Sequence, residues 1–340
     1  MSAILGWDIG GAHVKAARVE DGVVTAATQI PCAPHQGLAE IEAALRSMRR
    51  QMGVVERHAV TMTAELSDAF ADRKRGVVSI AAIFSQELAE PALFYAGARG
   101  FVEKREVAEA APAIASANWR APAELLARRG EAALLIDMGS TTTDLTLVGD
   151  GVVAAQGEDD ASRLARGELV YTGLLRGDPA AGLSLAPVDG SWTALVGERF
   201  ATMADVRRLT GDLSAEADVL PAADGRSKTL DDTRARLARL VGRDAASGTP
   251  AQWDALAQFF ARAQMRRIED AIALLASRDP AARSAPIVGA GIGRGVIAAH
   301  ARREGRDYRD FGALLPVAPA AALAAADCAP ACAVALLANG

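Results

Sequence analysis

The pattern of apolar and polar positions along the chain predicts an α/β protein with two similar halves. Residues 3–19 read as an apolar strand, an Asp-x-Gly-Gly turn and a second strand. Residues 132–153 repeat this plan around the turn Asp137-Met138-Gly139-Ser140-Thr141-Thr142-Thr143-Asp144. The first acids of the two turns, Asp8 and Asp137, lie 137 − 8 = 129 residues apart, a spacing typical of domains rather than of short repeats. The pattern therefore predicts two related domains, residues 1–130 and 131–340.

Between the two repeats, the apolar positions change to helical spacing. They predict a helix over 37–52, and a strand follows over 58–63. Residues 72–76 are mostly charged and predict a turn, with further strands over 77–83 and 93–95. The Ala-rich residues 104–128 predict helices with a break at Asn118-Trp119.

The second half contains a segment rich in Gly, Pro and Asp over about 178–250, which predicts a loop-rich insert with a short helix at 202–209. An amphipathic helix is predicted over 253–275, and a short strand from residue 286 leads into Gly289-Ala290-Gly291-Ile292-Gly293. The apolar residues 312–337 predict a buried C-terminal helix. Three prolines and Asp327 keep this segment below the roughly 20 uninterrupted apolar residues of a membrane-spanning helix.

Composition and charge exclude several classes of protein. The 340 residues are 51% hydrophobic, and 37 basic against 42 acidic side chains give a net charge of −5, without the basic surface that nucleic-acid binding needs. Three cysteines are too few for a disulfide framework or a zinc site, and the N-terminus lacks the pattern of a signal peptide. We therefore expect a cytoplasmic protein that binds neither nucleic acid nor membrane. The oligomeric state stays open, a homo-oligomer included.

The first glycine turn has residues that suit a diphosphate. Glycines allow the backbone to approach a phosphate closely, so Gly10 and Gly11 are candidate phosphate-binding residues and Lys15 is a candidate cation for the diphosphate. Asp8, at the end of the strand, is a candidate Mg²⁺ ligand, because this ion prefers oxygen ligands and keeps much of its water. The alternative is an ordinary hairpin, in which Asp8 caps the turn and Lys15 faces solvent.

The second glycine turn is more specific. Asp137 is the second candidate Mg²⁺ ligand, and amides and hydroxyls surround a space of phosphate size, so Gly139, Ser140, Thr141 and Thr142 are candidate binding residues. In the alternative interpretation, the hydroxyls only satisfy local backbone groups.

A third glycine loop follows the late strand that begins at residue 286. It lacks the Gly-x-Gly-x-x-Gly spacing of a dinucleotide site. It suits close contact with a nucleoside through Gly289 and Gly291, or the close packing of a helix start.

The order of these three loops resembles the acetate and sugar kinase, Hsp70 and actin superfamily over essentially the whole chain. This resemblance implies two ribonuclease-H-like domains that flank a central cleft. Within the superfamily, Thr63–Phe70 and Arg73–Val77 resemble the hydantoinase and oxoprolinase group. The turn at Asp137, Asn118-Trp119 and Gly167–Gly173 resemble its small subgroup of methanofuran-biosynthesis synthases.

The resemblance implies a Mg²⁺-dependent transferase. It would join an aminomethylfuran diphosphate to the phenol of a tyramine or tyrosine derivative and release diphosphate, with the choice of phenol left open. One alternative is a small-molecule kinase or ATPase that uses ATP or ADP, although Ala12-His13 stands where the superfamily usually has Ser or Thr. Another is a nucleotide-controlled binding protein without catalysis.

Four charged residues after the strand at 58–63 are candidates for the chemistry. Glu65 and Asp68 are spaced to share one face of a helical turn, and one of them is the candidate base for the phenol. Arg73 and Lys74 suit contact with diphosphate or a substrate carboxylate, or they pair with these acids to brace the loop. Asn118 is a candidate for lining the substrate pocket, or it caps a helix.

Overall fold

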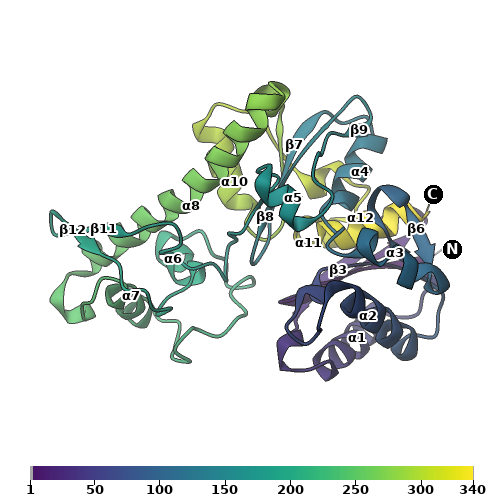
Figure 1. The fold of residues 1–340 in the computed structure, drawn as a ribbon, viewed down its shortest axis with the longest axis horizontal. Coiled ribbons are helices and arrows are strands. Elements are labelled where there is room, and N and C mark those ends of the chain that lie inside the picture. Colours follow the sequence, from purple (N-terminus) through teal and green to yellow (C-terminus); the bar gives the residue numbers. More distant parts are fainter. Residues whose placement is uncertain (1–2, 340) are drawn as a thin grey trace.

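The computed structural model describes residues 3–339, and its first half is built on one six-stranded sheet in the order β3-β2-β1-β4-β5-β6 (Figure 1). β1, β2 and β3 form an antiparallel meander, β4 pairs parallel with β1, and β5 pairs parallel with β4. All seven residues of the central strand β1 are buried. The strands are β1 (Ala3–Ile9), β2 (His13–Glu20), β3 (Val23–Pro31), β4 (Arg57–Met62), β5 (Ala92–Tyr95) and β6 (Phe101–Glu103).

Four helices accompany this sheet. The helix predicted over 37–52 is confirmed, and so are the two helices predicted over 104–128 with a break between them. The helices are α1 (Ala39–Met52), α2 (Arg73–Glu87), α3 (Val107–Ile114) and α4 (Arg120–Arg128).

The turn predicted over 72–76 and the strand predicted over 77–83 are wrong, because α2 occupies both segments. Asp72 caps this helix by accepting a hydrogen bond from the Arg75 backbone N–H at 2.8 Å. Val77, Ile80 and Phe84 are buried at helical spacing. Their apolar character is compatible with a strand or a helix. The cap at Asp72 favours the helix.

The second half is built on a sheet with the same plan. β7 pairs antiparallel with β8 and parallel with β13, and the order is β10-β8-β7-β13-β14, with β9 also paired to β8. In both sheets, an antiparallel hairpin continues into parallel strands through its first strand. The predicted α/β class with two ribonuclease-H-like halves is therefore confirmed. The strands are β7 (Ala133–Met138), β8 (Thr143–Gly149), β9 (Val152–Val153), β10 (Leu169–Val170), β13 (Ile287–Ala290) and β14 (Tyr308–Asp310).

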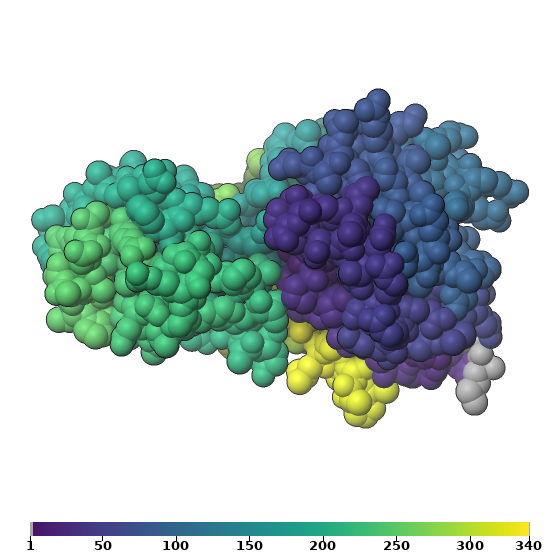
Figure 2. Space-filling model, turned by 90° about the horizontal axis from the view of Figure 1, so that it is seen from below, coloured from purple at the N-terminus to yellow at the C-terminus, as the bar shows by residue number. Residues whose placement is uncertain are grey.

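The insert of the second half forms a lobe of its own beside the first domain (Figure 2). It has a separate apolar core, which includes Val206, Leu237 and Phe260. The segment predicted as loop-rich thus contains regular structure, and the predicted short helix and long amphipathic helix are confirmed. The elements are β11 (Leu185–Val188), β12 (Ser191–Ala194), α6 (Met203–Thr210), α7 (Leu230–Arg239) and α8 (Pro250–Arg278).

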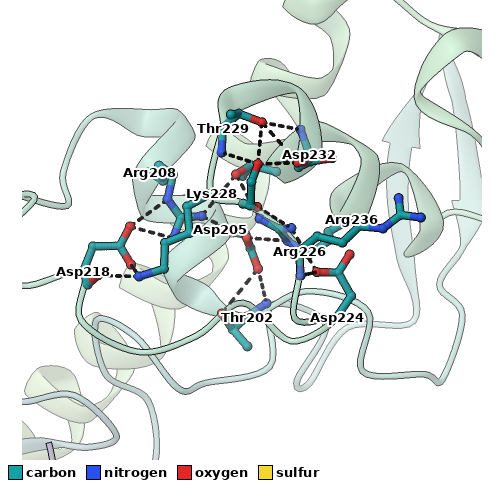
Figure 3. Close-up of polar contacts among 12 residues, drawn as sticks. Thr202, Asp205, Arg208, Asp218, Asp224, Arg226, Lys228, Thr229, Asp232 and Arg236 are labelled. Atoms are coloured by element: carbon teal, nitrogen blue, oxygen red, sulfur yellow. Dashed lines mark hydrogen bonds and ion pairs between the residues drawn. The ribbon is translucent and has the colours of Figure 1, made fainter.

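A buried polar network organises the loops of the insert (Figure 3). Asp205 accepts hydrogen bonds from Arg236 Nε at 2.8 Å, from Arg208 Nη1 at 3.0 Å and from the Thr202 backbone N–H at 2.9 Å. Arg236 also donates to Asp224 at 3.1 Å and is fully buried. A buried charge is tolerated when it is paired and hydrogen-bonded in this way, so the network fixes α6 against α7.

The C-terminal segment returns to the first half. α12 packs on β1, β2 and β4 and on α4, within a core shared by both sheets. Gly6 makes this contact possible, because a Cβ there would lie 2.0 Å from the Ala331 carbonyl oxygen. The predicted single helix is divided in two. The remaining helices are α5 (Asp160–Ala165), α9 (Ala281–Ser284), α10 (Arg294–Arg303), α11 (Ala322–Asp327) and α12 (Ala329–Asn339).

No single helix within residues 3–339 has the length and apolar character to cross a membrane. One bent pair, Pro319–Asp327 with Ala329–Asn339, meets the criterion by length and composition only.

Candidate active site

The two glycine turns are equivalent in structure. In the first, the Gly10 N–H donates to the His13 carbonyl oxygen at 3.0 Å; in the second, the Gly139 N–H donates to the Thr142 carbonyl oxygen at 2.9 Å. Both turns join the first two strands of their sheet. The two hairpins, 129 residues apart in the sequence, thus have the same backbone hydrogen bond at equivalent positions.

The acids that precede the glycines face different partners. Asp8 lies opposite Lys15 in the first hairpin, and Asp137 lies opposite Asp144 in the second. Lys15 Nζ is 3.8 Å from Asp8 Oδ2. An ion pair therefore stands in one hairpin where two acids stand in the other.

Burial and charge shift the pKa values of this cluster. Burial raises the pKa of Asp137 to about 7, and the nearby carboxylates of Asp144 and Asp8 add to the rise against the opposing charge of Lys15. Burial also raises the pKa of Asp8, although Lys15 and the Asn118 side chain favour its ionised form. For Lys15, burial opposes the charged form, but Asp8 and Asp137 outweigh it and raise its pKa. The cluster therefore has more negative charge than Lys15 alone can balance.

This cluster fits a divalent cation. Asp8 Oδ1 is buried and has no hydrogen-bond partner, so one carboxylate oxygen is available as a ligand. Asp137 gains ionised character when positive charge is added, because its raised pKa comes partly from neighbouring acids. Two carboxylates and water are a donor set that Mg²⁺ accepts. Asp8 and Asp137 could therefore hold this ion, as the sequence suggested.

A cavity of about 140 Å³ lies where the two hairpins meet. Gly11 from the first turn and Thr141, Thr142 and Asp144 from the second line it, together with Asn118. A Cβ at Gly11 would meet no atom within 4 Å, so this glycine leaves open space rather than serving packing. The structure thus brings Gly11, Thr141, Thr142 and Asn118 together around one space.

The hydroxyl residues of the second turn have two roles: Thr143 bonds to the backbone, whereas Thr141 and Thr142 line the cavity. Thr143 Oγ1 donates to the Thr172 carbonyl oxygen at 2.7 Å, which is a local role. Ser140 Oγ is buried without a partner. Gly173 packs on the outside of the turn, since a Cβ there would lie 2.6 Å from the Thr141 backbone nitrogen. The close packing of Gly173 fixes the loop that carries Ser140 and Thr141.

Glu65 is the second residue of the site, after Asp137, whose pKa is raised to about 7. It is almost fully buried, and Oε1 accepts a hydrogen bond from Ser116 Oγ at 2.8 Å while Oε2 has no partner. Burial raises the pKa of Glu65 to about 7, and the Ser116 bond opposes this rise. Ser116 itself lines the cavity. A carboxyl group with this pKa is suited to proton transfer near neutral pH.

The prediction that Glu65 and Asp68 share one face is wrong. The 3₁₀ helix that contains Glu65 ends at Leu66, and Asp68 is exposed. Close packing against α2 holds the Glu65 backbone, because a Cβ at Gly76 would lie 2.7 Å from the Glu65 carbonyl oxygen.

The two predicted cations of this region have different positions. Arg73 donates from Nη2 to Asp160 Oδ2 at 2.8 Å, so it connects the first half to the second rather than pairing with Glu65 or Asp68. Lys74 is exposed on α2. The cavity lining includes Asp160 but neither Arg73 nor Lys74.

The third glycine loop is tightly packed. A Cβ at Gly289 would lie 2.5 Å from the Tyr308 hydroxyl oxygen. A Cβ at Gly291 would lie 2.3 Å from Asp137 Oδ1, and Gly291 has φ +77°. The loop was expected either to contact a ligand or to pack closely. The structure supports close packing, because neither Gly289 nor Gly291 has room for a side chain. Gly291 also supports the position of Asp137.

Three residues at the cavity were not predicted from the sequence: Ser116, Asp160 and Arg163. The Arg163 guanidinium carbon lies 3.9 Å from the ring centroid of Trp119, and Nη1 donates to Asp144 Oδ1 at 2.6 Å. Ser116 has φ +52°, which is unusual for a residue other than glycine. The break at Asn118-Trp119 was the available signal for Ser116. Asp160 and Arg163 lie on α5, for which the sequence gave no chemical signal.

These features define an α/β protein of two related halves whose paired hairpins bring Gly11, Thr141, Thr142 and Asp144 to one cavity. The family model Hydantoinase/oxoprolinase matches residues 56–331. The chain therefore belongs to the hydantoinase/oxoprolinase family, and the resemblance inferred from the sequence is confirmed.

The chain is similar in sequence to one characterised relative, and several solved structures resemble it at low sequence identity. The chain is 30% identical over 243 residues, 71% of this chain and 72% of the relative, to (4-{4-[2-(gamma-L-glutamylamino)ethyl]phenoxymethyl}furan-2-yl)methanamine synthase of Methanocaldococcus jannaschii. Component A of the Acidaminococcus fermentans (R)-2-hydroxyglutaryl-CoA dehydratase is 12% identical, with coverages of 99% and 97% and a TM-score of 0.47. A Streptomyces griseus ROK family glucokinase is 15% identical, with both chains fully covered and a TM-score of 0.46.

Proposed function

We propose that this protein is a cytoplasmic, Mg²⁺-dependent transferase that makes an aryl ether in the biosynthesis of a methanofuran-type cofactor. Its substrates are an aminomethylfuran carried as its diphosphate ester and the phenol of a tyramine or tyrosine derivative. The name of the relative describes a product in which a phenoxymethyl group is attached to a furan. The ether bond of that group is the bond that the proposed reaction forms. The relative supports the substrate class, and the site geometry supports the chemistry.

One observation carries the proposal: residues of both glycine turns line the same cavity as Ser116, whose hydroxyl donates to the buried Glu65 behind it. The diphosphate binds between the two turns, against Gly11, Thr141 and Thr142, with Lys15 as the protein's own cation. The N–H groups of Gly10 and Gly139 already donate within their turns, so these two glycines shape the backbone. Asp8 and Asp137 would hold Mg²⁺, which supplies further positive charge for the leaving group. Oriented donors of this kind stabilise charge as it develops on departing oxygens.

The reaction balances with groups of this chain. The phenol oxygen forms a bond to the furan methylene carbon, and the bond from that carbon to the diphosphate oxygen breaks with its electron pair leaving on diphosphate. The phenol proton passes to the Ser116 hydroxyl as the Ser116 proton passes to Glu65. Glu65 is therefore the base, and Ser116 is the relay between it and the cavity.

The test is a direct assay. The purified protein is incubated with Mg²⁺, aminomethylfuran diphosphate and a series of tyramine and tyrosine derivatives, and diphosphate and ether are measured together. We expect equal amounts of the two products. Diphosphate release without ether would contradict the transfer, because it indicates hydrolysis.

An ATP-dependent small-molecule kinase is the second candidate. The observation that favours it is a cavity of about 570 Å³ beside the third glycine loop, lined in part by Arg294, Gly295 and Tyr308, with room for a nucleoside. Phosphorylation of a small molecule by ATP, with no ether in the assay above, would favour this candidate. Nucleotide binding without any turnover would favour a non-catalytic binding protein.

A further inference from the structure

The long helix α8 runs beside α10 (Figure 1). A separate cluster of side chains that could hold a metal ion joins the C-terminal part of α8 to the end of α10. It consists of Glu269, His300 and Glu304, whose ligand atoms all lie within 4.8 Å of one another. The three residues line a cavity of about 570 Å³. None of them lines the cavity between the two glycine turns.

His300 provides the independent sign of a ligand. Its side chain is 3% exposed, and its Nδ1 is buried without a hydrogen-bond partner. This nitrogen lies 3.4 Å from Glu269 Oε1. A buried ring nitrogen without a hydrogen bond beside a carboxylate is unfavourable. A cation between them satisfies both.

The surrounding charges leave the two carboxylates free. Arg283 and Arg306 line the same cavity, yet within residues 3–339 neither arginine comes within 4.0 Å of Glu269 or Glu304 as an ion pair. Arg306 instead donates to the Ala285 carbonyl oxygen. The two carboxylates and a neutral imidazole together balance the charge of one divalent ion.

We propose that Glu269, His300 and Glu304 form a binding site for a divalent transition-metal ion such as Zn²⁺, Mn²⁺ or Co²⁺. One imidazole and two carboxylates suit these ions, and the cavity leaves room for water to complete the coordination. The ion fastens α8 to α10. Because the loop before α10 packs on Asp137 and Met138, the ion also stabilises the support of the candidate active site.

The experiment uses the full chain freed of metal with a chelator. Zn²⁺ and Mn²⁺ are titrated by calorimetry, and Co²⁺ by its visible absorption, which reports nitrogen and oxygen coordination. The background is the Asp137→Asn variant, so that binding at the glycine turns does not contribute. We expect one equivalent per chain, a rise in Tm on adding Zn²⁺, and affinity weakened at least tenfold in Glu304→Gln, Glu269→Gln and His300→Gln.

Two matched variants serve as controls. Asp270→Asn changes the neighbouring exposed acid on α8, and His35→Gln removes an exposed histidine far along the chain. Both should bind the ions as the parent does. Absence of saturable binding would overturn the proposal, and so would equal binding by the parent and Glu304→Gln. Glu304 is exposed, so this variant should fold even if His300→Gln does not.

Discussion

Lys15 Nζ lies 3.8 Å from Asp8 Oδ2 in the first hairpin, and the equivalent position opposite Asp137 in the second hairpin is held by Asp144. The two hairpins thus share a backbone but differ in charge. The first pairs its acid with a lysine across the hairpin. In the second, Asp144 pairs with Arg163 from α5 at 2.6 Å, and Asp137 has no ion-pair partner within 4.0 Å among the described residues. The demand for an added cation is therefore greatest at Asp137, whose pKa is raised to about 7.

Replacement of this acid separates its catalytic role from its structural role. In Asp137→Asn, we expect ether formation to fall by roughly 100-fold or more, because a ligand for the cation that stabilises the leaving diphosphate is lost. Stability should not fall in proportion, since the change removes a crowded negative charge. Product formation and Tm, measured together, check this. Activity near that of the parent would remove Asp137 from the proposed metal site.

Replacing Glu65 and Asp68 separately tests which of the two acids is the base, a choice that the sequence left open. Glu65→Gln should lower kcat by roughly 100-fold or more, because proton transfer by a positioned base contributes this much to catalysis. Asp68→Asn is the matched control and should retain activity, because Asp68 is exposed.

The pH profile of activity identifies the base. The base must be ionised, so activity of the parent should rise with pH through about 7, the pKa of Glu65, and this rise should be absent from the residual activity of Glu65→Gln. An unchanged profile in Glu65→Gln would assign the rise to another group, such as Asp137, whose pKa is also raised to about 7.

The raised pKa of Glu65 also predicts how stability depends on pH. In the unfolded chain its pKa is 4.5, and in the folded protein it is about 7. The folded state therefore holds a proton that the unfolded state releases between these values. Its stabilising contribution is complete below pH 4.5 and is lost as pH rises through 7, which corresponds to about 3 kcal/mol. Urea unfolding at pH 5 and pH 8 should show this loss in the parent and a smaller one in Glu65→Gln, and parallel losses would contradict it.

Two glycines should respond in opposite ways to alanine. Gly11 has open space around its Cβ position, so Gly11→Ala should change the free energy of unfolding by less than about 0.5 kcal/mol while weakening diphosphate binding. Gly291 has φ +77° and no room beside Asp137 Oδ1, so Gly291→Ala should destabilise the fold by about 1–3 kcal/mol. Denaturant unfolding and diphosphate titration measure both effects.

A third glycine provides the control for this pair. Gly295→Ala, also with open space, lies on α10 outside the 140 Å³ cavity and should leave diphosphate binding unchanged. Equal loss of binding in Gly11→Ala and Gly295→Ala would contradict the assignment of Gly11.

The repeated hairpins were accessible from the sequence because their pattern is local. An apolar strand, an acid, glycines and a second strand specify a hairpin through neighbouring residues alone, and the repeat at 129 residues then indicates a second domain. The segment over 72–83 was not accessible in the same way. Val77, Ile80 and Ile83 suit a strand or a helix by character, and Asp72 suits a turn as well as a helix cap.

By itself, the sequence determined the family, the α/β class and the acids and glycines of both turns, because each depends on residue order over short distances. The tertiary structure decided which of these residues meet. It buried Glu65 against Ser116, exposed Asp68 and set Arg73 against Asp160, all contacts or exposures that depend on segments distant in the chain. It also placed α12 on the first sheet. Burial and long-range charge exist only in the folded chain, and they raise the pKa values on which the proposed chemistry depends.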